Sequence, residues 1–329
     1  MVILKVSQMK ATAVAYPIQG LIKYHGMRKP EQRIPYHDSI SVCVQACNTK
    51  TTVETSDSSK ENVVILNGEE LGGREKVRAE AILNELKRSA GFSGSFKVVS
   101  ENSFKVGKGL GFSASGFAAL GVAASQALDL HLDPTSLSET VRLGAGSATR
   151  SLAGGFAIWY ANKSGRSYAE QLDTQHPKEF SMLVVPVHSD VKTDEAHAEV
   201  LSSPLFKARL RYVGAMLKTM KDAVKEGDVA TIGKLAEEDT LNLHAITMTG
   251  KSHMVLWEPD TLRVMKEVAR MRKDGITAWY SMDTGPSVFI NTYKKNMEVI
   301  AKRLHKIGIG NVIASGVGGK PFLTDRHLF

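Results

Sequence analysis

The chain has 329 residues, of which 43% are hydrophobic and 23% are charged, as is ordinary for a globular protein. This length is too great for one small hydrophobic core, so we expect two lobes. The formal net charge is +8. Lysine and arginine are scattered among acidic residues, without a dense basic tract interleaved with aromatic residues, which disfavours a nucleic-acid partner. A positive field that attracts a small polyanion is the favoured use of the surplus charge.

The sequence contains two cysteines, Cys43 and Cys47, in an apolar stretch. In one extended strand they would share a face but lie too far apart for a disulfide. No further cysteine or histidine stands at a metal-ligand spacing, so we predict buried free thiols and no metal site.

Residues 1–5 are too short for a signal-peptide core, and no apolar run reaches the ~18 residues of a membrane span. We therefore expect a cytoplasmic protein without a membrane partner.

The first hundred residues are predicted to be mainly β structure. Alternation or apolar runs predict strands, and turn residues such as Asn67-Gly68 separate them. One helix is predicted because Ala79, Ile82, Leu83 and Leu86 fall on a single helical face. The predicted strands are 10–16, 39–46, 63–66 and 95–101, and the predicted helix is 74–89.

A glycine-rich segment, residues 107–116, then runs directly into an alanine-rich apolar stretch at 117–128. A glycine turn that opens a buried helix is the sequence form of an anion-binding loop. A helix at 134–143, the segment Gly144 to Arg150 and a strand at 154–159 complete a predicted N-terminal lobe, residues 1–178.

The remaining residues, 179–329, are predicted to form a C-terminal lobe. An apolar run at 181–187 gives its first strand, and segments with helical spacing follow. The predicted helices are 204–225, 228–247, 260–274 and 294–307, and the predicted strands are 278–282 and 287–291. The chain as a whole is therefore expected to be a two-lobed α+β protein.

The glycine-rich segment suggests phosphate binding, because backbone amides at a helix N-terminus bind anions. It lacks the Gly-Lys-Ser/Thr of a P-loop, and no acidic residue stands at the distance that a dinucleotide-binding fold requires. A tight turn that lets the following helix pack on a sheet is the alternative interpretation.

Three further positions suggest chemistry. Lys23 lies in an apolar, strand-like setting, where an ammonium without a partner is costly, unless the side chain reaches water. Asp283 begins a Gly-Pro turn, where a carboxylate can also simply cap its own loop. Arg150 follows Ser147, and its guanidinium suits a carboxylate or a phosphate, although a surface ion pair is the plainer alternative.

Together these motifs resemble those of one family. Lys23-Tyr-His-Gly26 is similar to the Lys-Tyr-Trp-Gly element of the diphosphomevalonate decarboxylases, which belong to the superfamily of galactokinase, homoserine kinase, mevalonate kinase and phosphomevalonate kinase. The segment from Gly109 to Gly116 resembles their Gly-Leu-Ala-Ser-Ser-Ala-Ala/Ser-Gly loop. The segment from Gly144 to Gly155 and Asp283-Thr-Gly-Pro also have counterparts, so the resemblance spans almost the whole chain.

The resemblance implies a kinase-type fold, with a left-handed βαβ-type glycine loop in the first lobe and an α/β sandwich in the second. It implies a catalytic trio of Asp283, Lys23 and Arg150, a phosphorylated mevalonate as substrate, and a homodimer. Implied substrate-binding residues are Tyr24, His25, Arg28, Ser147 and Lys192. The implied phosphate loop consists of Lys105, Gly107, Lys108, Gly109, Gly111, Ser113 and Ser115.

Departures from the family pattern point to a particular substrate. Met27 replaces a family lysine, which fits a C5 group smaller than a diphosphate, and Phe112 replaces a serine of the loop, where a benzyl group would crowd ATP. The chain resembles the archaeal branch, and most closely a mevalonate 3,5-bisphosphate decarboxylase. The expected reaction is ATP-independent decarboxylation to isopentenyl phosphate, without a cofactor. An ATP- and Mg²⁺-dependent decarboxylase of phosphomevalonate or diphosphomevalonate is the alternative.

Overall fold

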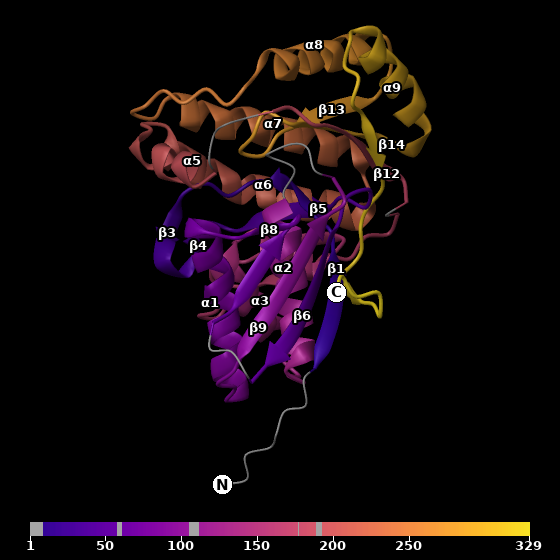
Figure 1. Ribbon diagram of the computed structural model, residues 1–329. Coiled ribbons are helices and arrows are strands. Elements are labelled where there is room, and N and C mark those ends of the chain that lie inside the picture. Colours follow the sequence, from indigo (N-terminus) through magenta and orange to yellow (C-terminus); the bar gives the residue numbers. More distant parts are fainter. Residues whose placement is uncertain (1–8, 58–60, 105–111, 177, 189–192) are drawn as a thin grey trace.

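A computed structural model describes residues 9–57, 61–104, 112–176, 178–188 and 193–329. Two lobes lie one above the other, with the C-terminus beside β1 of the lower lobe (Figure 1). The predicted two-lobed α+β fold is confirmed. The predicted phosphate loop between residues 107 and 111 lies outside the described residues.

The lower lobe has a six-stranded sheet in the order β16-β1-β6-β9-β7-β8, in which only the β7–β9 pair is parallel. Helices cover one face, and the helix predicted at 74–89 packs Ile82, Leu83 and Leu86 against Phe96 and Val98 of the sheet. The strands are β1 (Lys10–Ala15), β6 (Thr49–Ser56), β7 (Val63–Leu66), β8 (Glu69–Glu70), β9 (Ser95–Asn102) and β16 (Phe322–Leu323). The helices are α1 (Gly73–Ala90), α2 (Phe112–Ala127), α3 (Pro134–Gly144) and α4 (Ala148–Ala153).

A second, four-stranded sheet in the order β11-β10-β5-β2 lies between this layer and the upper lobe. Its strands are β2 (Ile18–Ile22), β5 (Ser39–Cys43), β10 (Phe156–Trp159) and β11 (Ala169–Gln171). A ribbon of β3 (Met27–Lys29) and β4 (Ile34–Pro35), joined by the 3-10 turn η1 (Pro30–Gln32), follows β2. Strand β2 is buried along its whole length and leads directly to Lys23.

The upper lobe is built on the four-stranded sheet β13-β14-β12-β15. Alternate residues of β12 face opposite cores, since Met182 and Val184 join one cluster and Leu183 and Val185 another. The continuous apolar run in the sequence therefore reflects burial on both faces. The strands are β12 (Phe180–Val185), β13 (Ala278–Ser281), β14 (Val288–Tyr293) and β15 (Ile313–Ser315). The helical segments are α5 (Thr193–Glu199), η2 (Val200–Ser202), α6 (Phe206–Glu226), α7 (Val229–Met248), α8 (Pro259–Lys273), η3 (Lys294–Asn296) and α9 (Met297–Lys306).

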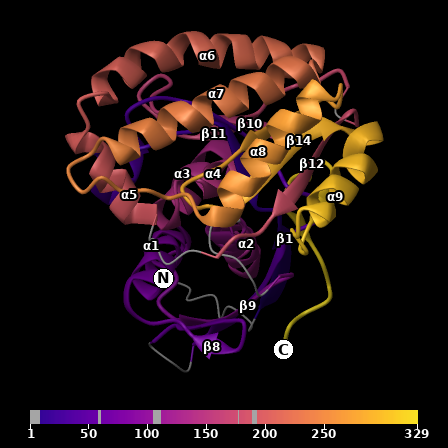
Figure 2. The ribbon, with the colours of Figure 1, turned by 90° about the horizontal axis from the view of Figure 1, so that it is seen from above.

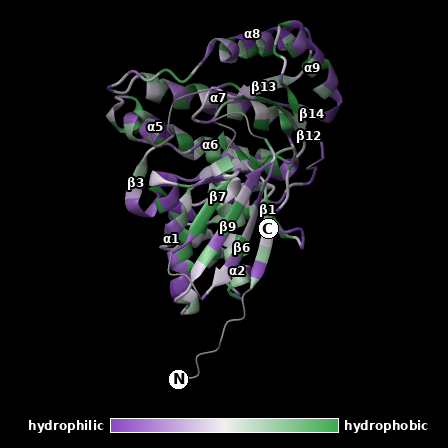
Figure 3. Cartoon of the chain, viewed as in Figure 1, coloured by the Kyte–Doolittle hydropathy of each residue, from purple (hydrophilic) through white to green (hydrophobic). Residues whose placement is uncertain are grey.

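Helices α6 and α7 lie side by side on one face of this sheet, and α8 and α9 lie on the other (Figure 2). Local sequence fixes several helix ends. Asp228 accepts a hydrogen bond from the Thr231 N–H to begin α7, and Gly227 ends α6 in the left-handed conformation. Hydrophilic residues colour much of the outward surfaces of α8 and α9, while green apolar residues mark the strands (Figure 3).

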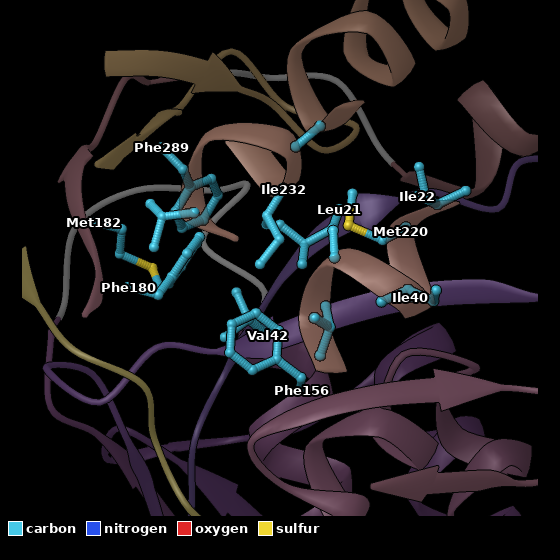
Figure 4. Close-up of a cluster of buried hydrophobic side chains, with 14 of the residues drawn as sticks. Leu21, Ile22, Ile40, Val42, Phe156, Phe180, Met182, Met220, Ile232 and Phe289 are labelled. Atoms are coloured by element: carbon cyan, nitrogen blue, oxygen red, sulfur yellow. The ribbon is translucent and has the colours of Figure 1, made fainter. Parts of the chain in front are cut away.

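One hydrophobic cluster joins the two lobes, and we call it the lobe-joining core. It combines residues of β2, β5 and β10 with residues of β12, β14, α6 and α7 (Figure 4). Phe156 and Phe180, from different lobes, make an edge-to-face contact with ring centroids 5.2 Å apart. Its labelled members are Leu21, Ile22, Ile40, Val42, Phe156, Phe180, Met182, Met220, Ile232 and Phe289. The core places the end of β2 beneath α7.

The two cysteines are buried free thiols, as predicted. Burial raises the pKa of the Cys43 thiol to about 12 and that of Cys47 to about 11, so both stay protonated near neutral pH. Among the described residues, no helix combines the length and the apolar character that a membrane crossing needs.

Candidate active site

The candidate site forms where the end of β2 meets the turn that follows β13. The backbone N–H of Gly20 donates to Asp283 Oδ1 over 2.9 Å, and the Ser281 hydroxyl donates to the Gly20 carbonyl over 3.2 Å. These bonds fix Asp283 against β2. A Cβ atom at position 20 would lie 2.7 Å from Asp283 Oδ1 and 2.8 Å from Lys23 Cγ, so the close approach requires glycine.

We expect Gly20→Ala to lower kcat roughly a hundredfold, because the added methyl displaces the two predicted catalytic side chains. Steady-state kinetics and thermal unfolding would measure the effect. Gly214→Ala, at an exposed position of α6 where nothing lies within 4 Å of a new Cβ, is the matched control and should leave kcat unchanged. Wild-type kinetics in Gly20→Ala would contradict the assigned geometry.

Lys23 is buried, with 4% of its surface exposed. Its ammonium Nζ lies 3.0 Å from Thr240 Oγ1 and 3.6 Å from Asp239 Oδ2, both on α7. Burial lowers the pKa of this ammonium from its usual 10.5, and the negative charges of Asp239 and Asp283 oppose that shift. The nearby carboxylates therefore favour the charged form of Lys23, against the effect of burial.

Asp283 is half-buried in the turn after β13. Burial raises the pKa of its carboxyl above the usual 3.8, whereas the charges of Lys23 and Arg150 act in the opposite direction. The three predicted catalytic residues therefore lie within electrostatic reach of one another, although they come from β2, α4 and the turn after β13.

Arg150 is buried in the short helix α4. Its guanidinium carbon lies 5.3 Å from the centroid of the Tyr24 ring and 5.8 Å from that of Trp159. Burial lowers the pKa of Arg150 from its usual 12.5. Among the described residues, its Nε and Nη1 have no hydrogen-bond partner. A buried guanidinium with free donors is suited to bind an anionic ligand.

Three histidines lie around this group. His25 Nε2 is 3.2 Å from Thr284 Oγ1, and its ring meets the His197 ring edge-on at 4.6 Å. His244 is hydrogen-bonded to the backbone of Asp283. Burial lowers the pKa of His25 well below its usual value and that of His244 to about 3, so both rings are neutral at pH 7. They hold the Asp283–Thr284 turn without adding charge.

The other predicted site residues are placed differently. Tyr24 stacks on His197 with ring centroids 5.0 Å apart, and Ser147 precedes α4 as a half-buried residue. Arg28 is exposed on β3, and Ser113 is exposed in the first turn of α2. Ser115 is fully buried, and its hydroxyl bonds the Thr49 hydroxyl and the Phe112 carbonyl, so it serves the internal structure here. Lys105, Gly107, Lys108, Gly109, Gly111 and Lys192 lie outside the described residues.

Two buried residues beneath Lys23 were not predicted. Asp239 and Arg209 have fully buried side chains and form an ion pair of 2.9 Å. A signal for both exists in the sequence, since charged residues stand at helical spacing from apolar ones: Arg209 lies between Phe206 and Val213 of α6, and Asp239 lies between Ala236 and Leu243 of α7. A charge on the buried face of an amphipathic helix marks a candidate functional residue.

Comparison with known proteins places this geometry in a family context. Residues 15–169 match the family model of the diphosphomevalonate decarboxylase-like N-terminal domain, and residues 191–315 match that of the mevalonate 5-diphosphate decarboxylase C-terminal domain. A phosphomevalonate decarboxylase from Haloferax volcanii is 39% identical over 97% of this chain and 98% of its own length. A mevalonate 3,5-bisphosphate decarboxylase from Thermoplasma acidophilum is 27% identical over 87% of this chain and 71% of its own length.

Among solved structures, the chain is similar to the mevalonate diphosphate decarboxylase from Enterococcus faecalis, in a study of ATP binding mediated by mevalonate diphosphate. The TM-score is 0.90 at 30% identity, over 97% of this chain and 99% of the other. The likeness thus covers both lobes and the turn that carries Asp283.

Proposed function

Because this chain belongs to the diphosphomevalonate decarboxylase family, we propose that it is an ATP-dependent decarboxylase of mevalonate 5-phosphate. Its products would be isopentenyl phosphate, CO2, inorganic phosphate and ADP. At the coarser level it is a carboxy-lyase that acts on a phosphorylated mevalonate. The observation that carries the proposal is the grouping of half-buried Asp283 with buried Lys23 and Arg150 in one site.

The proposed chemistry has two steps. The C3 hydroxyl of mevalonate is a poor leaving group, so it would first be phosphorylated by the co-substrate ATP, with loss of ADP. Asp283 would take the hydroxyl proton and release it to solvent, so that its carboxylate is charged again before the C3–O bond breaks. The C3–O bond then breaks with its electron pair on the departing phosphate. The C1–C2 electron pair becomes the C2–C3 double bond, and C1 leaves as CO2.

The three residues would stabilise the charges that arise in these steps. The Asp283 carboxylate, fixed by the Gly20 N–H, would face the positive charge that develops at C3. Lys23 would stabilise the C3 oxygen as its bond breaks. The unpartnered donors of Arg150 would hold the substrate carboxylate or the departing phosphate. These charges are set in place before the reaction, which is the condition for a large electrostatic effect.

Two observations support a monophosphate substrate and ATP. The phosphomevalonate decarboxylase relative is more similar, at 39% identity, than the bisphosphate relative, at 27%. The position of Phe112 also gives its ring a purpose other than the exclusion of ATP. Phe112 begins α2, is half-buried and packs against the lobe-joining core, which gives its ring a role in apolar packing. The exposed Ser113 stands beside it at the start of α2, where N–H groups can bind phosphate.

ATP-independent decarboxylation of mevalonate 3,5-bisphosphate remains the second candidate. Met27 and Phe112 favour it, since they replace a lysine and a loop hydroxyl of the family pattern. The exposed Arg28, next to Met27, would bind the C5 phosphate. The expected homodimer and cytoplasmic location stay predictions.

One assay separates the two candidates. The purified protein is incubated with mevalonate 5-phosphate or with mevalonate 3,5-bisphosphate, each with and without MgATP, and products are followed by phosphorus NMR. We expect isopentenyl phosphate from the monophosphate only when MgATP is present, with one ADP for each product. Turnover of the bisphosphate without nucleotide, combined with no turnover of the monophosphate, would establish the second candidate instead.

A further inference from the structure

The backbone of Lys23 is held on both sides by one buried ion pair. Asp239 Oδ2 accepts a hydrogen bond of 2.8 Å from the Lys23 N–H, and Arg209 Nη2 donates one of 2.7 Å to the Lys23 carbonyl. The same Nη2 donates to Asp239 Oδ1 over 2.9 Å. We call Asp239 and Arg209 the Lys23 clamp. It joins β2 of one lobe to α6 and α7 of the other.

The clamp also reaches the side chain of Lys23. The Nζ atom lies 3.6 Å from Asp239 Oδ2, and it donates to Thr240 Oγ1 over 3.0 Å and to the Ala236 carbonyl over 3.4 Å. All three acceptors belong to α7. The Thr240 hydroxyl is in turn 3.3 Å from Ser281 Oγ and accepts from the Met282 N–H, just before Asp283. One helix thus orders Lys23 and the strand that leads to Asp283.

Stability alone is a poor explanation for such a pair. Both side chains are fully buried, and desolvation of buried charges often exceeds their mutual attraction. Arg209 Nε has no hydrogen-bond partner among the described residues, which adds to the cost. Apolar side chains at these two helix positions would avoid the desolvation cost, but they would leave the buried Lys23 N–H and carbonyl without these partners. A buried charge pair that touches a predicted catalytic lysine therefore points to a role in that lysine's chemistry.

We propose that Asp239, held by Arg209, is a positioning residue that keeps the Lys23 ammonium charged and directed at the reacting oxygen. This inference rests on the proposed function, because it assigns Lys23 a role at that oxygen. Asp239 would act through Lys23, without itself touching the substrate.

A change in pH dependence follows from the charges around Lys23. The groups that face it are Asp239 and His244 of α7, Asp283 of the turn after β13, and Arg209 of α6. Burial lowers the pKa of Lys23, and Asp239 is the strongest influence that raises it again. Removal of the Asp239 charge therefore lowers the pKa of Lys23 further. Since the proposed mechanism uses the protonated amine, activity would then be lost at a lower pH as the pH rises.

The test compares Asp239→Asn with the wild type and with Glu237→Gln. Glu237 is the matched control, because it lies on the same helix and accepts two 2.8 Å bonds from Arg272, away from Lys23. For Asp239→Asn we expect a loss in kcat of about tenfold to a hundredfold, little change in KM, and a shift of the basic limb of kcat by about one pH unit toward lower pH. Glu237→Gln should lower the unfolding temperature and leave this limb in place.

A second variant separates positioning from mere folding. Asp239→Asn combined with Arg209→Gln removes both charges, so it should recover thermal stability if the unpaired Arg209 destabilises the single variant. We expect the basic limb to stay shifted in the double variant, although by less than in Asp239→Asn, because the Arg209 charge also lowers the pKa of Lys23 but has a smaller influence than Asp239. Recovery of both stability and the wild-type pH profile would show that the clamp is structural only and would overturn the inference.

A measurement that needs no turnover keeps the inference distinct from the proposed function. Carbon-13 NMR of protein labelled at lysine Cε follows the Lys23 ammonium, assigned by its loss in Lys23→Arg. We expect its titration to move to lower pH in Asp239→Asn and to be unchanged in Glu237→Gln. An unchanged titration overturns the inference, even if the decarboxylase activity is found. If the titration shifts but the protein turns over no phosphorylated mevalonate, the proposed function is refuted and the influence of Asp239 on Lys23 stands.

Discussion

Replacement of Asp283 by asparagine is expected to lower kcat on the order of a thousandfold while leaving the fold intact. The amide oxygen can still accept the Gly20 N–H bond of 2.9 Å, so the turn keeps its anchor. What is lost is the negative charge that would face C3 and the base that would take the hydroxyl proton. Steady-state kinetics with mevalonate 5-phosphate and MgATP measure the loss in kcat. Circular dichroism and thermal unfolding test whether the fold is intact.

Asp274→Asn is a suitable control, because Asp274 is an exposed ion-pair partner of Arg303 far from the site, and its loss should not alter kcat. In the wild type, burial raises the pKa of Asp283 above 3.8. As the pH is lowered, kcat/KM should therefore begin to decline at a pH above 3.8. Full activity in Asp283→Asn would refute the role of this carboxylate.

Replacement of Arg150 by methionine is expected to lower kcat/KM by about a hundredfold or more and, at the same time, to raise the unfolding temperature by roughly 2 °C. Two guanidinium nitrogens of Arg150 lack partners among the described residues, and each buried unsatisfied group costs about 1–3 kcal/mol. Its contacts with the Tyr24 and Trp159 rings stabilise the folded state by only about 0.5–2 kcal/mol. Methionine removes the unsatisfied donors and keeps an apolar chain between the rings.

The sign of the stability change distinguishes this account from an ordinary core mutation. Arg142→Met is the comparison, since Arg142 is also buried but donates to the carbonyls of Gln32 and Ser167. Its loss should lower the unfolding temperature, opposite to the change at Arg150. If both variants lose stability, Arg150 is a structural residue and not a preorganised anion site.

Local sequence patterns predicted most of the secondary structure, because strong periodicity dominated in the long elements. The helix predicted at 228–247 is α7, Val229–Met248, and the strand predicted at 95–101 is β9. The eight-residue strand β6 and several shorter elements, among them α4 and β16, were not predicted. Strand β16 exists through its pairing with β1, which lies about three hundred residues earlier, and no local pattern carries that information.

Site residues that belong to a recognisable motif could be predicted from the sequence. Those whose position depends on tertiary packing could not. Motifs identified Asp283, Lys23 and Arg150 as candidates, and the fold brings all three together. The direction of the Phe112 ring depends on the lobe-joining core, which is assembled from both halves of the sequence. The Lys23 clamp was predictable only in part. The sequence indicates that Arg209 and Asp239 occupy buried helix positions, but it does not show that they meet beneath Lys23.

The lobe-joining core has a consequence for how this enzyme can diversify. Because residues of both lobes share one apolar interior next to Lys23, the packing that joins the lobes also supports the floor of the candidate site. A substitution that changes the shape of this floor also disturbs the packing that joins the lobes. We therefore expect substitutions that change the choice of substrate to be tolerated best at exposed positions such as Arg28 and Ser113, where a side chain can vary without disturbing the interior.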